Sequence, residues 1–172
     1  MLVNPFLKIK SLKNYGFEKV HTIRTRKKRV NEINGVDGYL MTSAELDNLQ
    51  NKRKIAYRFS VFEGEYAYLK SEIFSDKNMV FEMHYTTIDD WKKVRPDLKT
   101  IYIFPTDIEK AKLQISKRNL TSEAEILRIK EITEQYNFMK SDKNFQNKFD
   151  YIFFNNYDMV SEEKLIDLIE RT

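Results

Sequence analysis

Basic side chains gather in one short segment of the chain, residues 24–29, whose sequence is RTRKKR. The acid Glu32 comes shortly afterwards and is followed by the glycine-bearing stretch INGVDG. A guanidinium presents a planar fork of N–H groups that binds two oxygens of a phosphate or a carboxylate at once. The residue types and their spacing therefore favour two alternatives, a solvated basic loop or a clamp for a phosphate group.

Composition excludes several other classes of site. The 172 residues include no cysteine, which excludes disulfides, thiol nucleophiles and Cys-ligated metals, and only two histidines, His21 and His84, so we expect no metal site. The formal net charge of +4 suits an anionic ligand and argues against an extended nucleic-acid surface. No apolar run is long enough to span a bilayer, and the N-terminal segment is too charged for a secretory signal. We therefore expect a cytoplasmic protein without a membrane partner.

Apolar strand patterns alternate with helical patterns along most of the chain. Strands are predicted at residues 17–23, 78–85, 99–105 and 149–156, and helices at 42–52, 87–94, 108–139 (with a polar break) and 161–170. The aromatic stretch 55–69 alternates around Gly64 and predicts an antiparallel hairpin. This order favours an α/β fold with a mostly parallel central sheet and a small antiparallel piece to one side. No linker-like composition interrupts it, so we expect a single domain over residues 1–172.

Five collinear segments resemble the guanylate kinase family, whose members phosphorylate GMP from ATP. They are RTRKKRVNEINGVDGYLMTSAEL, FEGEYAYLKSEI, the stretch from NMVFEMHY to TIYIFPTD, KRNLTSEAEILRI, and FDYIFFNN. The resemblance covers nearly everything from about Phe17 onward. It implies a P-loop-kinase-like parallel sheet flanked by helices, a small mixed or antiparallel GMP-binding lobe at about residues 22–78, and a helical lid at about 117–126. It also implies phosphorylation of GMP, with ATP and Mg²⁺ as cofactors if the chain is active.

The same resemblance implies roles for particular side chains. Two arginines bind the phosphate of GMP in the family, an acid follows them, and tyrosine hydroxyls complete the clamp. The corresponding candidates for substrate binding are Arg26, Arg29, Glu32, Tyr39, Tyr66 and Tyr68. Lid arginines and an acid at a strand end serve phosphoryl transfer, and an asparagine lies near the adenine. The corresponding candidates are Arg118, Arg128 and Glu82 for catalysis and Asn155 for cofactor binding.

The family's glycine-rich phosphate loop, G-x-x-x-x-G-K-[ST], has no counterpart in this sequence. If NPFLKIKS is aligned with the loop, Asn4, Leu7 and Ile9 replace its glycines, and side chains there would keep the backbone away from a phosphate. A second alignment is favoured, in which LVNPFLKIKSL is the first helix, because Phe6, Ile9 and Leu12 share one helical face. Either alignment compromises the ATP site, so weak or absent turnover is expected.

Other departures concern the acceptor site. Gly38 stands where the family has a phosphate-binding tyrosine, and Tyr57 replaces the glutamate that reads guanine. His84 replaces the second acid of the strand end, and Glu32 and Glu82 could equally be charge partners of the arginines. A second function therefore stays open, that of a non-catalytic module which holds a phosphate on a nucleotide or on a phosphorylated or acidic protein segment.

Overall fold

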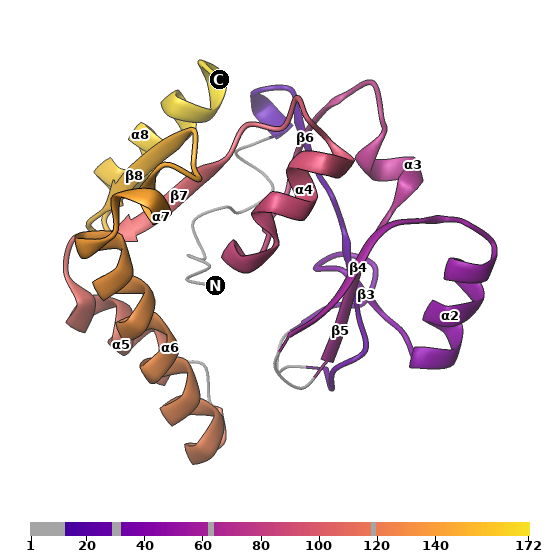
Figure 1. Ribbon diagram of the computed structural model, residues 1–172, viewed down its shortest axis with the longest axis horizontal. Helices are drawn as coiled ribbons and strands as arrows, with labels where there is room; N and C mark the ends of the chain where they lie inside the picture. Colours follow the sequence, from indigo (N-terminus) through magenta and orange to yellow (C-terminus); the bar gives the residue numbers. More distant parts are fainter. Residues whose placement is uncertain (1–12, 29–31, 62–63, 118–119) are drawn as a thin grey trace. The chain divides into compact units, whose positions relative to one another are not determined.

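The structure is a computed structural model that describes residues 13–28, 32–61, 64–117 and 120–172 (Figure 1). The chain divides into two compact units, of which the N-terminal unit ends at Glu82 and the C-terminal unit begins at Met83. The single domain predicted for residues 1–172 stays a prediction, and so do the lobe at 22–78 and the lid at 117–126. In the part of the chain that the structure describes, no helix is both long enough and apolar enough to cross a membrane.

The described part of the N-terminal unit contains two sheets with short helices beside them. Its elements are β1 (Phe17–Lys19), β2 (Thr22–Arg24), β3 (Tyr39–Leu40), α2 (Ser43–Asn51), β4 (Ile55–Val61), β5 (Gly64–Leu69), α3 (Lys70–Ile73) and β6 (Asn78–Val80). β1 pairs with β6 in parallel, and the larger sheet has the order β3-β2-β5-β4. In that larger sheet β2 is parallel to β3 and antiparallel to β5, and β4 and β5 form the predicted antiparallel hairpin.

The register of the larger sheet divides its side chains between two faces, because successive side chains of a strand point to opposite sides. Cross-strand pairs place six residues on one face, which we call the aromatic face: Thr22, Arg24, Tyr57, Phe59, Tyr66 and Tyr68. The other face, called the helix face, is apolar and packs against α2. Its buried core consists of Ile23, Leu46, Ile55 and Ala67, with Tyr39, Met41, Leu49 and Leu69 packed against it.

The start of α2 is fixed by the capping box that the sequence predicts. The N–H of Glu45 donates to the hydroxyl of Thr42 at 3.2 Å, and the N–H of Thr42 donates to the Glu45 carboxylate at 2.8 Å. These two bonds satisfy backbone donors that a helix terminus otherwise leaves without partners. The helix then presents Leu46 to the core of the sheet.

Among its described residues, the C-terminal unit is built around a parallel pair of strands. Its elements are η1 (Tyr85–Thr87), α4 (Ile88–Val94), β7 (Ile101–Pro105), α5 (Ile108–Ser116), α6 (Ser122–Ser141), α7 (Lys143–Gln146), β8 (Tyr151–Asn155) and α8 (Met159–Glu170). β7 and β8 pair in parallel from Ile101 opposite Tyr151 to Pro105 opposite Asn155. Aromatic side chains of α6 and α7 pack on Tyr102 and Phe104 of β7. The predicted mixed α/β fold with parallel sheets and flanking helices is confirmed.

Two predicted strands differ from the prediction. The strand predicted at 17–23 is divided into β1 and β2, which belong to different sheets. The strand predicted at 78–85 ends at Val80, and the single-turn η1 begins after His84, whose Nδ1 accepts the N–H of Thr86 at 3.4 Å. A side chain that accepts a nearby backbone N–H competes with strand pairing at that position. The helical region predicted at 108–139 is broken where expected, and α6 restarts with Thr121 as its N-cap.

Candidate functional site

One carboxylate and two guanidiniums of the N-terminal unit form a compact ion cluster, which we call the arginine clamp (Arg24, Arg26 and Glu32). Arg26 donates from Nη1 to Oε2 of Glu32 at 2.9 Å and from Nη2 to Oε1 at 2.7 Å. Arg24 donates from Nη1 to the same Oε1. The arginine side chains are 14% and 12% exposed and that of Glu32 is 9% exposed, so water reaches the cluster only in part. The fork of Arg26 thus holds an anion through two oxygens.

The positive charge of Arg26 is stable around neutral pH. Burial opposes the charged form of Arg26, but the hydrogen bond and the negative charge of Glu32, together with Tyr66, outweigh burial and raise the pKa of Arg26 above its usual value. The guanidinium therefore stays protonated, and its preference for an anion is permanent. Tyr66 is the predicted substrate-binding tyrosine that the structure brings to this cluster.

A row of stacked rings extends from the clamp across the aromatic face. The ring of Phe59 lies 5.6 Å from that of Tyr57, at 24°, and 5.5 Å from that of Tyr66, at 22°. All three side chains are half-buried, so each ring keeps part of its surface open. Flat rings arranged in this way can stack on a nucleobase without reading its identity.

Tyr68, another predicted substrate-binding residue, lies on the aromatic face, but it is buried and its hydroxyl bonds to the backbone. It is 2% exposed, and its hydroxyl donates to the carbonyl of Glu82 at 2.6 Å. Burial raises the pKa of this phenol well above its usual range, against a hydrogen bond with Thr22 that lowers it. The contact fastens the segment after β6, including the predicted catalytic residue Glu82, to the sheet.

Tyr39 is not brought together with the clamp. It is opposite Ile23 in the parallel β2–β3 pair and packs with the helix-face core, and its ring lies 5.4 Å from that of His21. The sequence suggested Tyr39 because it is adjacent to Gly38, the position of the family's tyrosine. A shift of one residue along a strand turns the side chain to the opposite face.

Arg24 is the clamp residue that sequence reasoning missed. It stood in the basic cluster, but the resemblance selected Arg26 and Arg29 instead. The available signal was its spacing, since β2 ends at Arg24 and residues two apart in an extended chain share a face. Arg29, Arg118 and the segment 1–12, where the phosphate loop would be sought, lie outside the described residues.

A second polar cluster lies in the C-terminal unit and includes the predicted catalytic residue Arg128. Arg128 donates to Oε2 of Glu131 at 3.1 Å, and Oε1 of Glu131 lies 3.0 Å from Nε2 of His84. Burial disfavours the charged form of Glu131, but its hydrogen bond with His84 and nearby positive charge outweigh burial and lower the pKa of Glu131. Arg128 is therefore already engaged by a carboxylate of its own helix.

Asn155, the predicted cofactor-binding residue, is 2% exposed at the end of β8. Its side-chain oxygen accepts the N–H of Tyr157 at 2.8 Å, so it shapes the turn after the strand. The next residue, Asn156, is exposed and accepts the hydroxyl of Thr106 at 2.6 Å. The carboxyl ends of parallel strands are where α/β proteins bind ligands, which makes Asn156 the more accessible amide of the two.

Magnesium requires oxygen ligands, usually carboxylates together with phosphate and water. Within residues 13–28, 32–61, 64–117 and 120–172 no group of three or more His, Asp or Glu side chains is placed to hold a metal. Both ring nitrogens of His84 have partners, Thr86 and Glu131. The described side chains therefore offer no all-protein cage for magnesium, an ion that is usually held by one or two carboxylates together with phosphate oxygens and water.

Comparisons with known proteins show what this chain is similar to. No protein-family model matches the chain. It is 26% identical over 164 residues to the guanylate kinase of Francisella tularensis subsp. holarctica (strain OSU18), covering 92% of this chain and 82% of that protein. It is 25% identical over 159 residues to the guanylate kinase of Wolbachia sp. subsp. Brugia malayi (strain TRS), covering 87% and 76%.

A solved structure shows the same fold. The crystal structure of guanylate kinase from Anaplasma phagocytophilum matches with a TM-score of 0.68 and 16% identity, covering 97% of this chain and 81% of that one. The family resemblance inferred from the motifs is confirmed by the two curated relatives, and the fold by this structure.

Proposed function

We propose that this chain, a guanylate-kinase-like protein by its similarity over most of its length and by its fold, binds the phosphate of a nucleoside monophosphate such as GMP at the arginine clamp. The coarse function that its relatives support is that of a GMP kinase. The proposal concerns which side chains of this chain recognise the acceptor and how far catalysis extends.

The observation that carries the proposal is the bidentate hold of Arg26 on Glu32. The carboxylate presents two oxygens to the guanidinium fork, as a phosphate does, so the geometry of the fork is already that of a phosphate receptor. Arg24 adds a second positive charge on the same side, and Tyr66 contributes next to Arg26. Phosphate binding would then proceed by sharing or displacing Glu32, with Arg29 as a further predicted ligand.

Base recognition is proposed to rest on stacking. The open row of Tyr57, Phe59 and Tyr66 offers π-faces beside the clamp, and Tyr57 stands where the family has its guanine-reading glutamate. Stacking tolerates any base, whereas a hydrogen-bonding carboxylate discriminates strongly. We therefore expect GMP and AMP to bind with affinities that differ by less than about tenfold.

Phosphoryl transfer from ATP with Mg²⁺ is proposed to be weak or absent in this chain, because its sequence has no glycine-rich phosphate loop. Arg118, Arg128, Glu82 and Asn155 stay predicted members of a transfer site. Arg128 would have to leave Glu131 before it could contact a phosphoryl group.

A non-catalytic module remains the second candidate, and the same clamp favours it. The clamp recognises oxygens and positions no group that reads a base, so a phosphorylated or acidic segment of another protein would satisfy it as well. The two functions differ in the molecule that carries the phosphate, which is a nucleoside in the first and a protein segment in the second.

The test is calorimetric titration of the chain with GMP, AMP and inorganic phosphate, together with an ADP-release assay containing ATP, Mg²⁺ and GMP. Arg26→Gln and Arg24→Gln should each weaken GMP binding by about tenfold or more, because a charge-assisted hydrogen bond contributes about 1.5–3 kcal/mol. Arg58→Gln is the matched control, since Arg58 belongs to the same sheet and pairs with Asp47 and Glu65 away from the clamp.

GMP binding that survives Arg26→Gln unchanged would refute the clamp. Turnover with GMP at the rate of an ordinary kinase would refute the proposed loss of catalysis, but it would be compatible with the proposed acceptor site. If none of the three ligands binds, the nucleotide proposal fails, and a phosphoserine peptide becomes the next ligand to titrate.

A further inference from the structure

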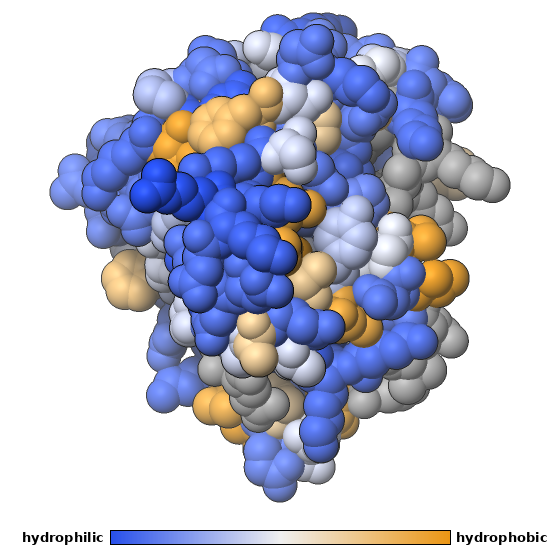
Figure 2. Space-filling view, turned by 90° about the vertical axis from the view of Figure 1, so that its right-hand side faces the viewer, coloured by the Kyte–Doolittle hydropathy of each residue, from blue (hydrophilic) through white to orange (hydrophobic). Residues whose placement is uncertain are grey.

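The larger sheet of the N-terminal unit ends in two edge strands, β3 and β4. An edge strand presents N–H and C=O groups that no neighbouring strand satisfies, and these groups can pair with a further strand. In the view of Figure 2, hydrophilic side chains cover most of that side of the protein, and apolar side chains show in small groups between them. Backbone pairing at a sheet edge is a mode of association that needs no broad apolar surface.

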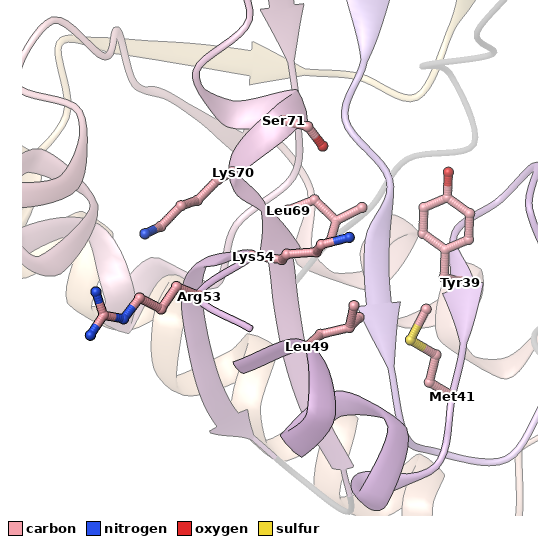
Figure 3. A pocket seen from close by; sticks show the side chains of 8 residues that line it. All are labelled: Tyr39, Met41, Leu49, Arg53, Lys54, Leu69, Lys70 and Ser71. Carbon is pink, nitrogen blue, oxygen red and sulfur yellow. The ribbon is translucent and has the colours of Figure 1, made fainter. Parts of the chain in front are cut away.

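The β3 edge is short and already capped. β3 spans only Tyr39–Leu40, and because the N–H of Met41 donates to β2, that of Leu40 points away from the sheet. It donates to the side-chain oxygen of Asn34 at 2.8 Å. Beside this strand, Tyr39 and Met41 line an open hollow together with side chains of α2 and β5 (Figure 3). The β3 edge therefore offers no row of open backbone groups to another strand.

The β4 edge is longer, and the register identifies its outward groups. In an antiparallel sheet, the N–H and C=O of one residue point to the same side, and that side alternates along the strand. The carbonyl of Glu65 in β5 accepts the N–H of Thr25, directly after β2, so the next residue of β5 bonds to its β4 partner Phe59. The neighbours of Phe59, Arg58 and Ser60, therefore direct their backbone groups out of the sheet.

The described part of the chain leaves these outward groups open. No described residue bonds to the backbone N–H or C=O of Arg58 or Ser60 on that side. Sheet edges are commonly protected by free charges, but Arg58 lies on the helix face, where Asp47 and Glu65 engage its guanidinium. Ser60 is exposed and uncharged. The β4 edge is therefore accessible to a further strand.

The accessible part of β4, which we call the open edge, is residues 57–61 with the sequence YRFSV. A register shift between Ile55 and Tyr57 interrupts regular pairing before it. Aromatic and β-branched side chains make up most of the open edge, and these types favour extended backbone. The segment also lacks proline, so every residue in it retains its N–H.

The open edge is complementary to a second copy of itself. If two copies pair antiparallel with Phe59 opposite Phe59, Arg58 of each copy lies opposite Ser60 of the other. The outward groups of these two residues then face each other and exchange both N–H···O bonds. Tyr57 lies opposite Val61, an aromatic and β-branched pair of the kind that stabilises sheets. Pairing centred on Arg58 would instead place like charges directly opposite, which is unfavourable.

We propose that the open edge of β4 pairs antiparallel with the open edge of a second copy of this chain, centred on Phe59, and forms a two-fold symmetric dimer with one continuous sheet. The interface is isologous, so each contact occurs twice. Because the paired segment is short, the dimer is weak, with an expected Kd between about 10 µM and about 1 mM. The proposal does not depend on the nucleotide function.

The first experiment is disulfide cross-linking, which reads the register directly because the chain has no cysteine of its own. In the proposed pairing the two Phe59 residues form a pair without hydrogen bonds, whose Cα atoms lie about 4.5 Å apart, within the range that a disulfide accepts. Phe59→Cys should therefore form a covalent dimer on mild oxidation. Tyr57→Cys is the matched control on the same face of the same strand, since the two copies of Tyr57 would lie more than about 12 Å apart.

The second experiment is sedimentation equilibrium of the full chain between about 10 µM and about 1 mM, which should show a monomer–dimer equilibrium. Ser60→Pro removes an outward N–H but no bond between β4 and β5, and it should raise the Kd by about tenfold or more. Ser60→Arg should raise it by about fivefold, because the new charge faces Arg58 of the second copy, whereas in its own copy it lies opposite Glu65. Ser60→Ala is the control and should keep the Kd within about twofold. Urea unfolding confirms that each variant folds.

Three results would overturn the proposal. A monomer over the whole concentration range would refute self-pairing and would leave the edge to an extended segment of another protein. A dimer whose Kd is unchanged in both Ser60→Pro and Ser60→Arg would place the interface elsewhere. Cross-linking of Tyr57→Cys as efficient as that of Phe59→Cys would refute the register centred on Phe59.

Discussion

The guanidinium of Arg24 lies beside Gly38, next to the space that a side chain at this position would fill. A Cβ atom on Gly38 would lie 3.3 Å from Cζ of Arg24 and 2.5 Å from the carbonyl oxygen of Thr22. The family's tyrosine could not stand at this position without moving β2. If the proposed acceptor site is correct, a guanidinium beside a glycine takes the place of the family's phenol, and the proposed site gains a charge where it loses a hydroxyl.

The first prediction concerns Gly38. Gly38→Ala should lower the free energy of unfolding by about 2–4 kcal/mol, because the new Cβ meets backbone and φ is 151°. Gly35→Ala is the control, since Gly35 also has a positive φ but open space around its Cβ, and should cost about 1–2 kcal/mol. Urea unfolding measures both, and equal losses would contradict the close packing of Gly38.

The second prediction concerns the internal anion of the clamp. Glu32→Gln should lower stability by about 1–3 kcal/mol, because it leaves two poorly exposed guanidiniums without their carboxylate. The same change should strengthen binding of GMP and inorganic phosphate, since the anion that occupies the fork of Arg26 is gone. Calorimetry and urea unfolding give both quantities. Weaker phosphate binding in Glu32→Gln would mean that Glu32 positions the arginines instead of competing for them.

The third prediction separates two tyrosines of the aromatic face. Tyr68→Phe should cost about 0.5–1.5 kcal/mol of stability, because its hydroxyl bonds to the carbonyl of Glu82, but should change GMP affinity little. Tyr66→Phe should weaken GMP binding and change stability little, since Tyr66 lies half-buried beside Arg26. Thermal unfolding and GMP titration of both variants give a crossed comparison, and a larger affinity loss in Tyr68→Phe would overturn it.

The fourth prediction is a pH dependence from Glu131. Its pKa in the folded protein is lowered from 4.5, so its contribution to stability is present above about pH 4.5 and is lost as the pH falls through the folded pKa. Glu131→Gln should therefore lose less stability than the wild type between about pH 6 and about pH 3.5. Glu134→Gln, which removes an exposed acid of the same helix, should behave as the wild type. Urea unfolding at the two pH values decides between these outcomes.

Much of the fold could be predicted because its signals are local. The capping box at Thr42, the hairpin between Ile55 and Leu69 and the apolar runs of β7 and β8 depend on neighbours a few residues apart. The short helix α3 was not predicted, because four residues carry too little periodicity for a pattern to be seen.

The site was harder to predict because it depends on which face of a sheet each side chain joins. The sequence indicated Arg26 and Glu32, but it could not exclude Tyr39, since one residue of offset decides its face. The Arg128–Glu131 pair could have been found from its helical spacing, whereas the contact of Glu131 with His84 spans 47 residues and has no local signal.

The position of Trp91 has a practical consequence for all these measurements. It is the single tryptophan of the chain, it is fully buried in α4, and it belongs to the C-terminal unit. Its fluorescence therefore reports the melting of that unit, while the clamp belongs to the unit that carries only tyrosine emission. A tryptophan trace and a tyrosine trace recorded in the same melt would show whether the two units unfold together, so the chain carries its own spectroscopic test of cooperativity.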